Sequence, residues 1–366
     1  MRIALDGSDL AADRVEGPSV YAGELLPRLS RLFRDRGHTV TTYLPGPPRG
    51  VIVAGETRMI PGSPFWTQRI FSAALRRDKP DVLFMPIQML PLFRPQSMKT
   101  VAVVHDLEFI HHSDTYTLAN RVLLNVFTRH AVRNTTQLIA VSQYTKDDVV
   151  RTYGRSPEDV TVVHHGVARE QFQNAGGREE IQRRYSLPTR YILFVGALQP
   201  RKNISGLITV FEELKRTEPT VHLVIVGGGE WKAAPILTRI ESSRIRDSIH
   251  LLRRVPRDDL AALYSMAAAF VLPSFSEGFG MPVLEAMAVG TPVVTSNTSA
   301  LPEVAGDAAL LINPKDPLAI AQALLRVLRD DALRENLIAK GRMRASHFTW
   351  DRAAEQTAAV IEKSGA

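Results

Sequence analysis

The sequence predicts an α/β protein made of two doubly wound domains in succession. Short apolar, β-rich runs alternate with helical patterns along the chain, which is typical of parallel sheets built from βαβ units. The alternation is interrupted once, by a polar stretch at residues 173–190. The length of 366 residues also indicates two domains, at about 100–200 residues per domain.

The apolar runs are nearly continuous in hydrophobic residues, as expected of strands buried on both faces. The first series predicts strands at Ile3–Leu5, Thr39–Leu44, Val51–Ala54, Val82–Met85, Val101–Val104, Leu138–Val141 and Val160–Val163. The helices predicted between them include Ser19–Phe33, Trp66–Arg77 and Thr117–Arg133. The second series predicts strands at Tyr191–Val195, His222–Val226, His250–Leu252, Phe270–Leu272, Pro292–Thr295 and Ala309–Ile312.

The polar stretch places the domain boundary near residue 180. We therefore expect an N-terminal domain over residues 1–180 and a C-terminal domain over residues 181–345. Helical patterns follow the last strand, and the second domain needs only part of them. The final pattern, within residues 346–366, is a candidate for a helix that crosses back to the first domain.

The composition favours a cytoplasmic globular protein. The chain has no cysteine, which excludes disulfides and thiolate metal sites. Its N-terminal residues are unlike a signal peptide, and no apolar run reaches the roughly 18 to 20 residues that span a bilayer. No recognised nucleic-acid-binding motif is found, so nucleic acid is not an expected partner.

The net charge of +7 is unevenly distributed. Residues 51–100 hold seven Lys and Arg side chains against three acidic ones, interleaved with aromatic residues such as Trp66 and Phe71. Two interpretations stay open. The stretch from Arg58 to Lys99 contacts anionic lipid headgroups, or it is a solvated helix face combined with core residues.

Two adjacent cations, Arg201 and Lys202, follow the predicted strand Tyr191–Val195. In parallel α/β sheets ligands bind at the carboxyl ends of strands, and a helix N-terminus there attracts anions. The pair is suited to a phosphate group, and a solvated basic turn is the alternative. The chain lacks the GxGxxG and GxxxxGK[ST] patterns, which argues against a nicotinamide dehydrogenase and a P-loop NTPase.

The most informative segment is PSFSEGFGMPVLEAMAVGTPVV, residues 273–294. A helix is predicted to begin near Met281, with Pro282 in its first turn, where no backbone donor is needed. Glu277 lies in the glycine-rich turn, and Glu285 lies in the helix eight residues later. Two carboxylates flanking a helix N-terminus are able to accept hydrogen bonds from several sugar hydroxyls. Ordinary solvated or capping glutamates are the alternative.

This segment closely resembles the signature of family-four retaining glycosyltransferases, a Glu, seven residues and a second Glu within an EGFG-type turn. The resemblance continues through VGALQPRKN, HHGVA, SALPEVAGDAA and HFTWDRAAEQTA. It covers the second half densely and the first half more loosely. It implies the GT-B fold, in which two Rossmann-like domains face each other across a cleft. The C-terminal domain would hold a nucleotide-sugar donor and the N-terminal domain would hold the acceptor.

The resemblance also implies roles for particular residues of the C-terminal domain. Glu285 would bind the ribose hydroxyls of the nucleotide, and Glu277 would bind hydroxyls of the transferred sugar. Arg201 and Lys202 would neutralise the diphosphate leaving group, so no metal and no cofactor is expected and the sugar nucleotide is a substrate. The remaining donor contacts, several through backbone N–H groups, would come from Gly278, Phe279, Gly280 and Met281, with Val255 near the base.

In the N-terminal domain, the resemblance selects His105, which follows the predicted strand Val101–Val104, as a contact to the donor sugar near its reacting carbon. A core histidine is the alternative. Family members usually carry a Gly-Gly-Ile-Gly type of loop over the diphosphate. This chain has RVEGPS at residues 14–19 instead and keeps one glycine, Gly17.

The expected function is retaining transfer of a hexose. The EGFGMPVLEAMA variant resembles O-antigen mannosyl- and rhamnosyltransferases, so the expected donor is GDP-mannose. The expected acceptor is an oligosaccharide or lipid-linked glycan in cell-envelope polysaccharide synthesis, at the inner face of the plasma membrane. UDP-sugar and deoxyhexose donors stay open. A nucleotide-sugar epimerase of GT-B fold and a catalytically silent nucleotide-sugar-binding protein are the alternatives.

Overall fold

The structure is a computed structural model that describes the whole chain except residues 12–16, 49–52, 112–116, 169–176, 229–232 and 366. The chain divides into two compact units. Unit 1 comprises Met1–Gly166 and Trp350–Ala366, and unit 2 comprises Val167–Thr349. The units therefore divide after Gly166, earlier than the residue-180 boundary that the polar stretch suggested.

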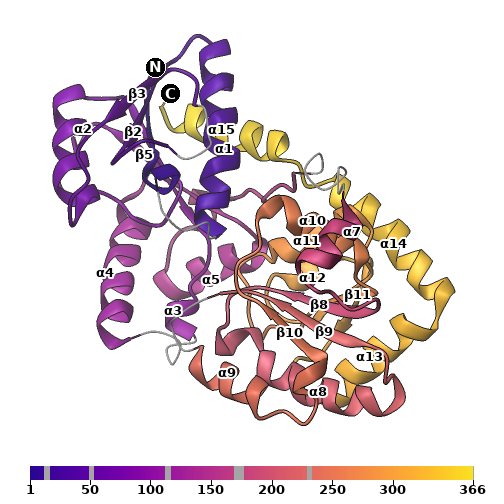
Figure 1. Cartoon of the computed structure of the whole chain (residues 1–366). Coiled ribbons are helices and arrows are strands. Elements are labelled where there is room, and N and C mark those ends of the chain that lie inside the picture. The colour runs from indigo at the N-terminus through magenta and orange to yellow at the C-terminus, as the bar shows by residue number, and fades with distance from the viewer. Residues whose placement is uncertain (12–16, 49–52, 112–116, 169–176, 229–232, 366) are drawn as a thin grey trace. The chain divides into compact units, whose positions relative to one another are not determined.

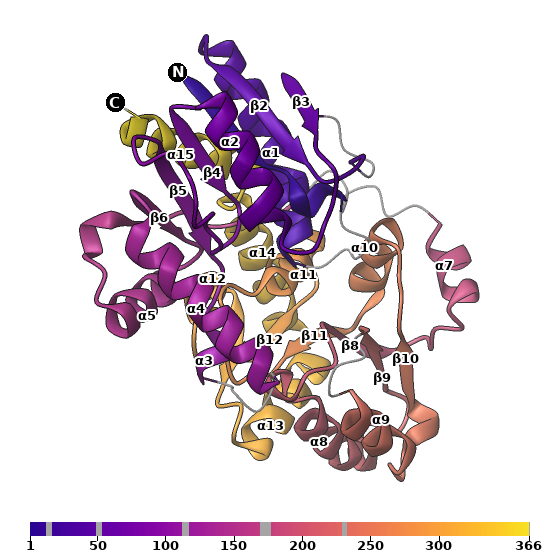
Figure 2. The same ribbon diagram turned by 90° about the vertical axis from the view of Figure 1, so that its left-hand side faces the viewer.

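Unit 1 is built on a parallel sheet with the strand order β3-β2-β1-β4-β5-β6-β7 in the described part of the chain. The strands are β1 (Arg2–Asp6), β2 (Thr39–Leu44), β3 (Glu56–Met59), β4 (Val82–Met85), β5 (Lys99–Val104), β6 (Gln137–Ala140) and β7 (Val160–Val162). The helices are α1 (Gly17–Asp35), α2 (Ser72–Asp78), α3 (Glu108–His111), α4 (Leu118–Asn134), α5 (Gln143–Tyr153) and α15 (Trp350–Gly365). Figures 1 and 2 show the yellow helix α15 alongside the indigo α1, and an ion pair between Arg28 and Asp351 joins the two.

One strand prediction in unit 1 is wrong. The apolar run Val51–Ala54 was expected as a strand, but the edge strand of the sheet is Glu56–Met59. Val53 and Ala54 have no strand structure, and residues 51 and 52 lie outside the described part of the chain. The strand β3 is mostly exposed and polar, so it carries no apolar pattern from which to predict it.

Unit 2 is built on a second parallel sheet, with the order β10-β9-β8-β11-β12-β13 in its described residues. Its strands are β8 (Tyr191–Val195), β9 (His222–Val226), β10 (Ile249–Leu252), β11 (Ala269–Leu272), β12 (Val293–Ser296) and β13 (Ala309–Ile312). Its helices are α7 (Arg178–Arg184), α8 (Ile204–Thr217), α9 (Ala234–Glu241), α10 (Arg257–Met266), α11 (Met281–Val289), α12 (Leu301–Ala305), α13 (Pro317–Arg329) and α14 (Asp331–Ser346). The two sheets confirm the predicted pair of doubly wound domains.

The strand order locates one binding edge in each sheet. The order reverses between β1 and β4 in unit 1 and between β8 and β11 in unit 2. In open α/β sheets, ligands bind outside the carboxyl ends of the strands at such a reversal. In unit 2 the loops at this edge follow Val195 and Leu272, and these are the loops that carry the predicted cations and Glu277.

The basic stretch from Arg58 to Lys99 is largely part of the fold. Trp66 and Phe71 are buried and stack on each other, with ring centroids 4.8 Å apart. Arg58 and Arg77 both form ion pairs with Asp78. These aromatic side chains therefore belong to the core of unit 1. Within the described residues, no helix is long and apolar enough to cross a membrane.

Candidate functional site

A cluster of charged side chains lies at the switch point of the unit 2 sheet. Glu277, in the loop after β11, accepts a hydrogen bond from Arg201 Nη1 at 3.0 Å and one from Lys202 Nζ. Both cations come from the loop after β8. Ser274 Oγ donates to Glu277 Oε1 at 2.7 Å, and the Glu277 backbone N–H donates to Ser299 Oγ at 2.9 Å. The carboxylate is thus held from several sides.

Glu277 is ionised in this cluster although it is buried. Burial by itself disfavours the charged form, but Lys202 and Arg201 outweigh it and lower the pKa of Glu277 to about 2. The three side chains together carry one net positive charge. With Glu277 already matched by one cation, the cluster is able to accept a further anion such as a phosphate.

The turn between Glu277 and α11 contains a backbone conformation that requires glycine, at Gly280. Gly280 has φ of 101°, and a Cβ on it would lie 2.6 Å from the side chain of Leu301, so only glycine fits. The helix begins at Met281, as predicted. Among the described residues, no acceptor is bound to the backbone N–H groups of Gly280 and Met281, as expected at a helix N-terminus. The N–H of Val283 donates to Gly280 O and is not available.

The other residues expected around this turn have separate environments. Gly278 is buried, and Phe279 is buried with its ring 6.1 Å from that of Phe348. Val255 lies half-buried in the loop between β10 and α10. The loop after β9 approaches the loop after β8 closely, since a Cβ on Gly227 would lie 1.9 Å from the Gly196 carbonyl oxygen. Glycine permits this approach.

Glu285, on α11, has a different environment from Glu277. Tyr264 Oη donates to Glu285 Oε2 at 2.9 Å, and Arg257 Nη2 lies 3.9 Å from Oε1. Burial raises the pKa of Glu285, an effect only partly offset by Arg257 and Tyr264. Sequence reasoning missed both partners. The sequence did contain one signal for them: Arg257 and Tyr264 are seven residues apart on α10, and residues at that spacing share one helix face.

In unit 1, His105 lies directly after β5. Its Nε2 lies 2.8 Å from the carbonyl oxygen of Pro86, so this nitrogen carries the proton. Burial lowers the pKa of His105, which favours the neutral imidazole. The rings of Tyr21 and His165 lie 4.9 Å and 5.5 Å from it, and Trp350 stacks on His165 at 5.7 Å. His105 therefore belongs to a cluster of four ring side chains that come from distant parts of the sequence.

The remaining predicted contact in unit 1 is Gly17, the first residue of α1, which is exposed. Residues 14–16 of the same loop lie outside the described part of the chain. Across the residues that the structure describes, no group of three His, Asp or Glu side chains is arranged to hold a metal ion. Independence from metal stays a prediction for experiment.

Comparison with known proteins gives two family matches. Residues 177–344 match the family model described as glycosyl transferases group 1, and residues 16–171 match the model described as glycosyltransferase family 4. The chain is 32% identical to the O-antigen chain mannosyltransferase B of Escherichia coli over 263 residues, 71% of this chain and 69% of that protein. It is 33% identical to a D-inositol 3-phosphate glycosyltransferase of Streptomyces bingchenggensis over 240 residues, 62% of this chain and 53% of that relative.

Among solved structures, Anabaena HepE in complex with UDP-glucose resembles this chain with a TM-score of 0.75 at 16% identity. The superposition covers 99% of this chain and 100% of that one. At this level of identity, the likeness concerns the fold. The two family matches fall on the two units, one on each side of the boundary after Gly166 apart from a few residues.

Proposed function

This chain belongs to glycosyltransferase family 4 and has the GT-B fold, and we propose that it transfers mannose from GDP-mannose to a glycan or lipid-linked glycan with retention of configuration. The observation that carries the proposal is the buried cluster of Glu277, Arg201 and Lys202 beside the N–H groups that begin α11. It combines a carboxylate for sugar hydroxyls with cations for a diphosphate.

In this proposal the two cations of the cluster gain a second anionic partner when the donor binds. Lys202 and Arg201, which hold Glu277 in the free protein, also meet the diphosphate. Negative charge grows on the diphosphate as its bond to the sugar breaks, and fixed cations stabilise that charge most strongly in the transition state. The sugar nucleotide is a substrate, and the two cations do the work that a metal ion does in other transferases.

Glu285 is proposed to bind the ribose. Tyr264 donates to one of its oxygens and Arg257 lies 3.9 Å from the other, so the carboxylate is oriented on α11. In unit 1, the neutral His105 is proposed to contact the donor sugar through Nδ1, because Nε2 is committed to Pro86. The aromatic neighbours of His105 limit its rotation.

The choice of donor rests on relatives and needs a direct test. The similarity to the Escherichia coli O-antigen mannosyltransferase supports GDP-mannose and a role in cell-envelope polysaccharide. The HepE complex with UDP-glucose and the similarity to inositol 3-phosphate glycosyltransferases support other donors and acceptors. A thermal-shift panel of GDP-mannose, UDP-glucose and UDP-N-acetylglucosamine tests the choice, and the largest stabilisation identifies the donor. Stabilisation by none of them would contradict the proposal.

A GT-B-fold epimerase is the competing activity within enzymes. It would bind the same donor and return a free nucleotide sugar. A transferase forms a new glycoside and releases GDP. Separation of the products of GDP-mannose turnover, with and without a glycan acceptor, distinguishes the two.

We also propose that the protein works in the cytoplasm, peripherally bound to the inner face of the plasma membrane. The exposed part of α4 supports this more directly than the stretch from Arg58 to Lys99. Four aliphatic side chains on its first half are between 47% and 74% exposed, namely Leu118, Val122, Leu123 and Val126. The helix carries three exposed arginines and no acidic residue. Apolar and cationic side chains on one helix are typical of contact with an anionic bilayer.

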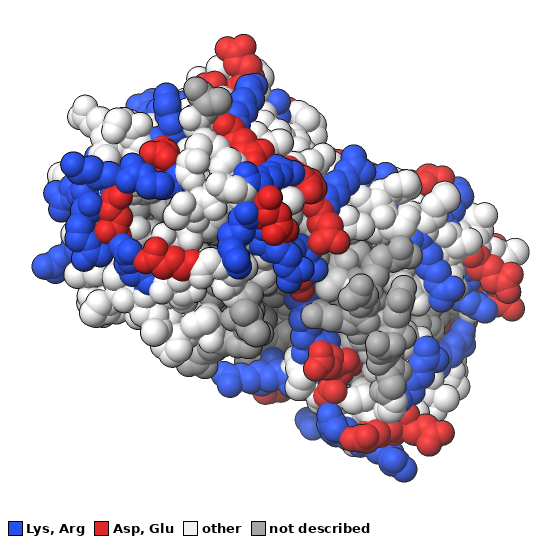
Figure 3. Space-filling model, turned by 90° about the horizontal axis from the view of Figure 1, so that it is seen from above, with Lys and Arg blue, Asp and Glu red and all other residues white. Residues whose placement is uncertain are grey.

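Further basic side chains lie elsewhere on unit 1. Figure 3 shows Lys and Arg gathered over its left-hand edge, on the side where Figure 1 places α2. Arg69, Arg76 and Lys79, which lie on α2 or next to it in the sequence, are exposed. Each Lys or Arg near an anionic surface contributes about 1 kcal/mol, so this region adds long-range attraction to the contact that α4 makes.

A further inference from the structure

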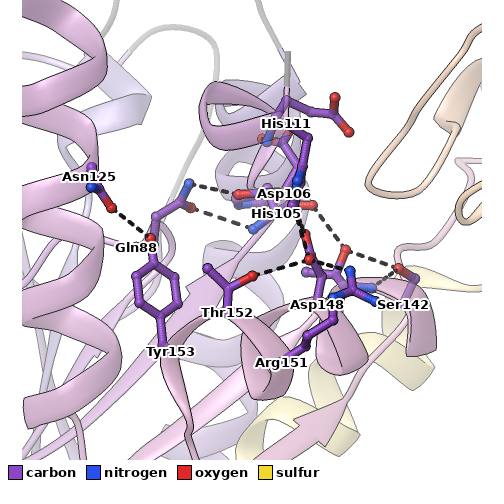
Figure 4. A network of polar contacts seen from close by, with 12 residues as sticks. Gln88, His105, Asp106, His111, Asn125, Ser142, Asp148, Arg151, Thr152 and Tyr153 are labelled. Atoms are coloured by element: carbon purple, nitrogen blue, oxygen red, sulfur yellow. Dashed lines mark hydrogen bonds and ion pairs between the residues drawn. The ribbon is translucent and has the colours of Figure 1, made fainter. Parts of the chain in front are cut away.

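A second polar network lies in unit 1, away from the residues assigned so far. Its centre is Asp148 on α5, whose side chain is only 3% exposed. Asp148 accepts hydrogen bonds from His111 Nε2, at 2.8 and 2.9 Å to its two oxygens, and from Arg151 at 2.6 Å. Thr152 Oγ1 donates to the same carboxylate at 3.3 Å. Figure 4 shows these side chains converging on Asp148, with His111 at the end of α3.

The contact with Asp148 determines how the His111 imidazole presents itself. Because Nε2 faces a carboxylate, which only accepts hydrogen bonds, Nε2 carries a proton. In the neutral imidazole, Nδ1 then has the lone pair. The His111 side chain is 36% exposed, and no described residue is bonded to Nδ1. A buried acid thus orients a half-exposed imidazole whose second nitrogen is open to a ligand.

The network adjoins the edge of the unit 1 sheet at which open α/β sheets generally bind ligands. Asp106, the second residue after β5, accepts a hydrogen bond from the backbone N–H of Glu108 at 3.2 Å and so begins the turn into α3. Gln88, after β4, donates to the Asp106 carbonyl at 3.4 Å. These loops lie at the carboxyl ends of β4 and β5, next to the strand-order reversal between β1 and β4.

We propose that His111 is an acceptor-site residue of the glycosyltransferase, with Nδ1 accepting a hydrogen bond from a hydroxyl of the incoming glycan. Asp148 is then a positioning residue that fixes the tautomer and the ring orientation. Arg151 already forms an ion pair with Asp148, so the charge of Asp148 is offset without a contribution from His111. The site therefore fits a neutral hydroxyl rather than a phosphate. This inference rests on the proposed function, because it needs a glycan acceptor.

The test distinguishes an effect on acceptor binding from an effect on donor binding. Four octyl glycosides (of mannose, glucose, N-acetylglucosamine and rhamnose) serve as acceptors, and transfer from the donor is measured alongside donor affinity and GDP release in the absence of acceptor. His111→Ala is expected to raise the acceptor KM about tenfold, the effect of one hydrogen bond left unmade. Donor affinity and acceptor-free GDP release should stay within about twofold of the native protein. In His111→Gln, the amide N–H replaces Nε2 and the amide oxygen replaces Nδ1, so most of the loss is recovered.

Arg151→Gln is the matched control, because it removes the arginine that pairs with Asp148 and leaves His111 unchanged. A purely structural link between α3 and α5 predicts that His111→Ala and Arg151→Gln both lower the melting temperature while the acceptor KM stays unchanged. That result would overturn the inference. Transfer to none of the four glycosides, with GDP release intact, would also overturn it and would leave the proposed function standing. Loss of donor binding by the native protein would instead contradict the proposed function.

Discussion

Glu277→Gln tests the charge cluster most sharply, because it changes one charge and almost no volume. In the native protein, Lys202 and Arg201 lower the pKa of Glu277 from 4.5 to about 2 despite its burial. At 1.36 kcal/mol per pKa unit, a shift of about 2.5 units corresponds to about 3 kcal/mol of stability near pH 7. The substitution also leaves two cations without their carboxylate. The upper limit of the expected loss of unfolding free energy is therefore about 3 to 5 kcal/mol.

The direction of the pKa shift determines how the stabilisation by Glu277 changes with pH. A lowered carboxyl pKa means that the unfolded chain binds more protons than the folded one between about pH 2 and 4.5. The stabilisation is therefore complete above about pH 4.5 and is lost as the pH falls towards 2. Urea unfolding should give a native-minus-variant difference of about 3 kcal/mol at pH 7 and about 1 kcal/mol at pH 3.

Glu285→Gln is the matched control, since burial raises the pKa of Glu285. A raised carboxyl pKa contributes stability at low pH that disappears as the pH rises through it, so this variant should not be destabilised by loss of charge at pH 7.

In Glu277→Gln, calorimetry should show GDP binding as tight as in the native protein or tighter, because Lys202 and Arg201 have lost a competing anion. Turnover should fall. Equal stability of Glu277→Gln and the native protein at pH 7, or weaker GDP binding, would refute the reasoning.

Three further predictions concern the ribose contact, the membrane and the role of His105. Glu285→Ala should weaken binding of free GDP about 10- to 150-fold, from a charged hydrogen bond worth roughly 1.5–3 kcal/mol, and unchanged GDP affinity would remove it from the ribose site. Replacing Leu118, Val122 and Val126 together by Ser should abolish co-sedimentation with anionic vesicles, whereas Leu318→Ser, at an exposed position of α13, should not. Equal binding by both variants would rule out α4 as the contact. His105→Asn should lower kcat while the GDP affinity stays native, and a loss of GDP affinity equal to the loss of kcat would argue for a structural role.

The fold was predictable because its strands are buried on both faces. Runs such as Tyr191–Val195 and Val82–Met85 are apolar throughout and coincide with β8 and β4. The edge strand β3 was missed because its residues are exposed and polar, and its neighbouring apolar run drew the prediction instead. Helix α15 packs against α1 through pairs more than 300 residues apart in sequence, a distance over which local patterns carry no information.

The part of the site that could be predicted is the turn in which a glycine required by the backbone and a charged side chain occur together. Gly280, with its positive φ, and Glu277 lie in one turn, so a single segment revealed both. The pairing of Glu277 with Arg201 and Lys202 was not visible, because it depends on β8 and β11 being neighbours in the sheet. The two cations were interpreted as phosphate contacts alone, and the structure adds that they hold Glu277 in the free protein.

The central claim is that Lys202 and Arg201 stabilise the departing diphosphate without a metal ion. The most direct measurement is GDP release from GDP-mannose in the presence of EDTA, for the native protein and for Lys202→Ala. The account predicts full native activity in EDTA and a fall in kcat on the order of 100-fold in the variant, larger than any change in KM. Native activity that disappears in EDTA and returns with magnesium, or a variant with native kcat, would contradict it.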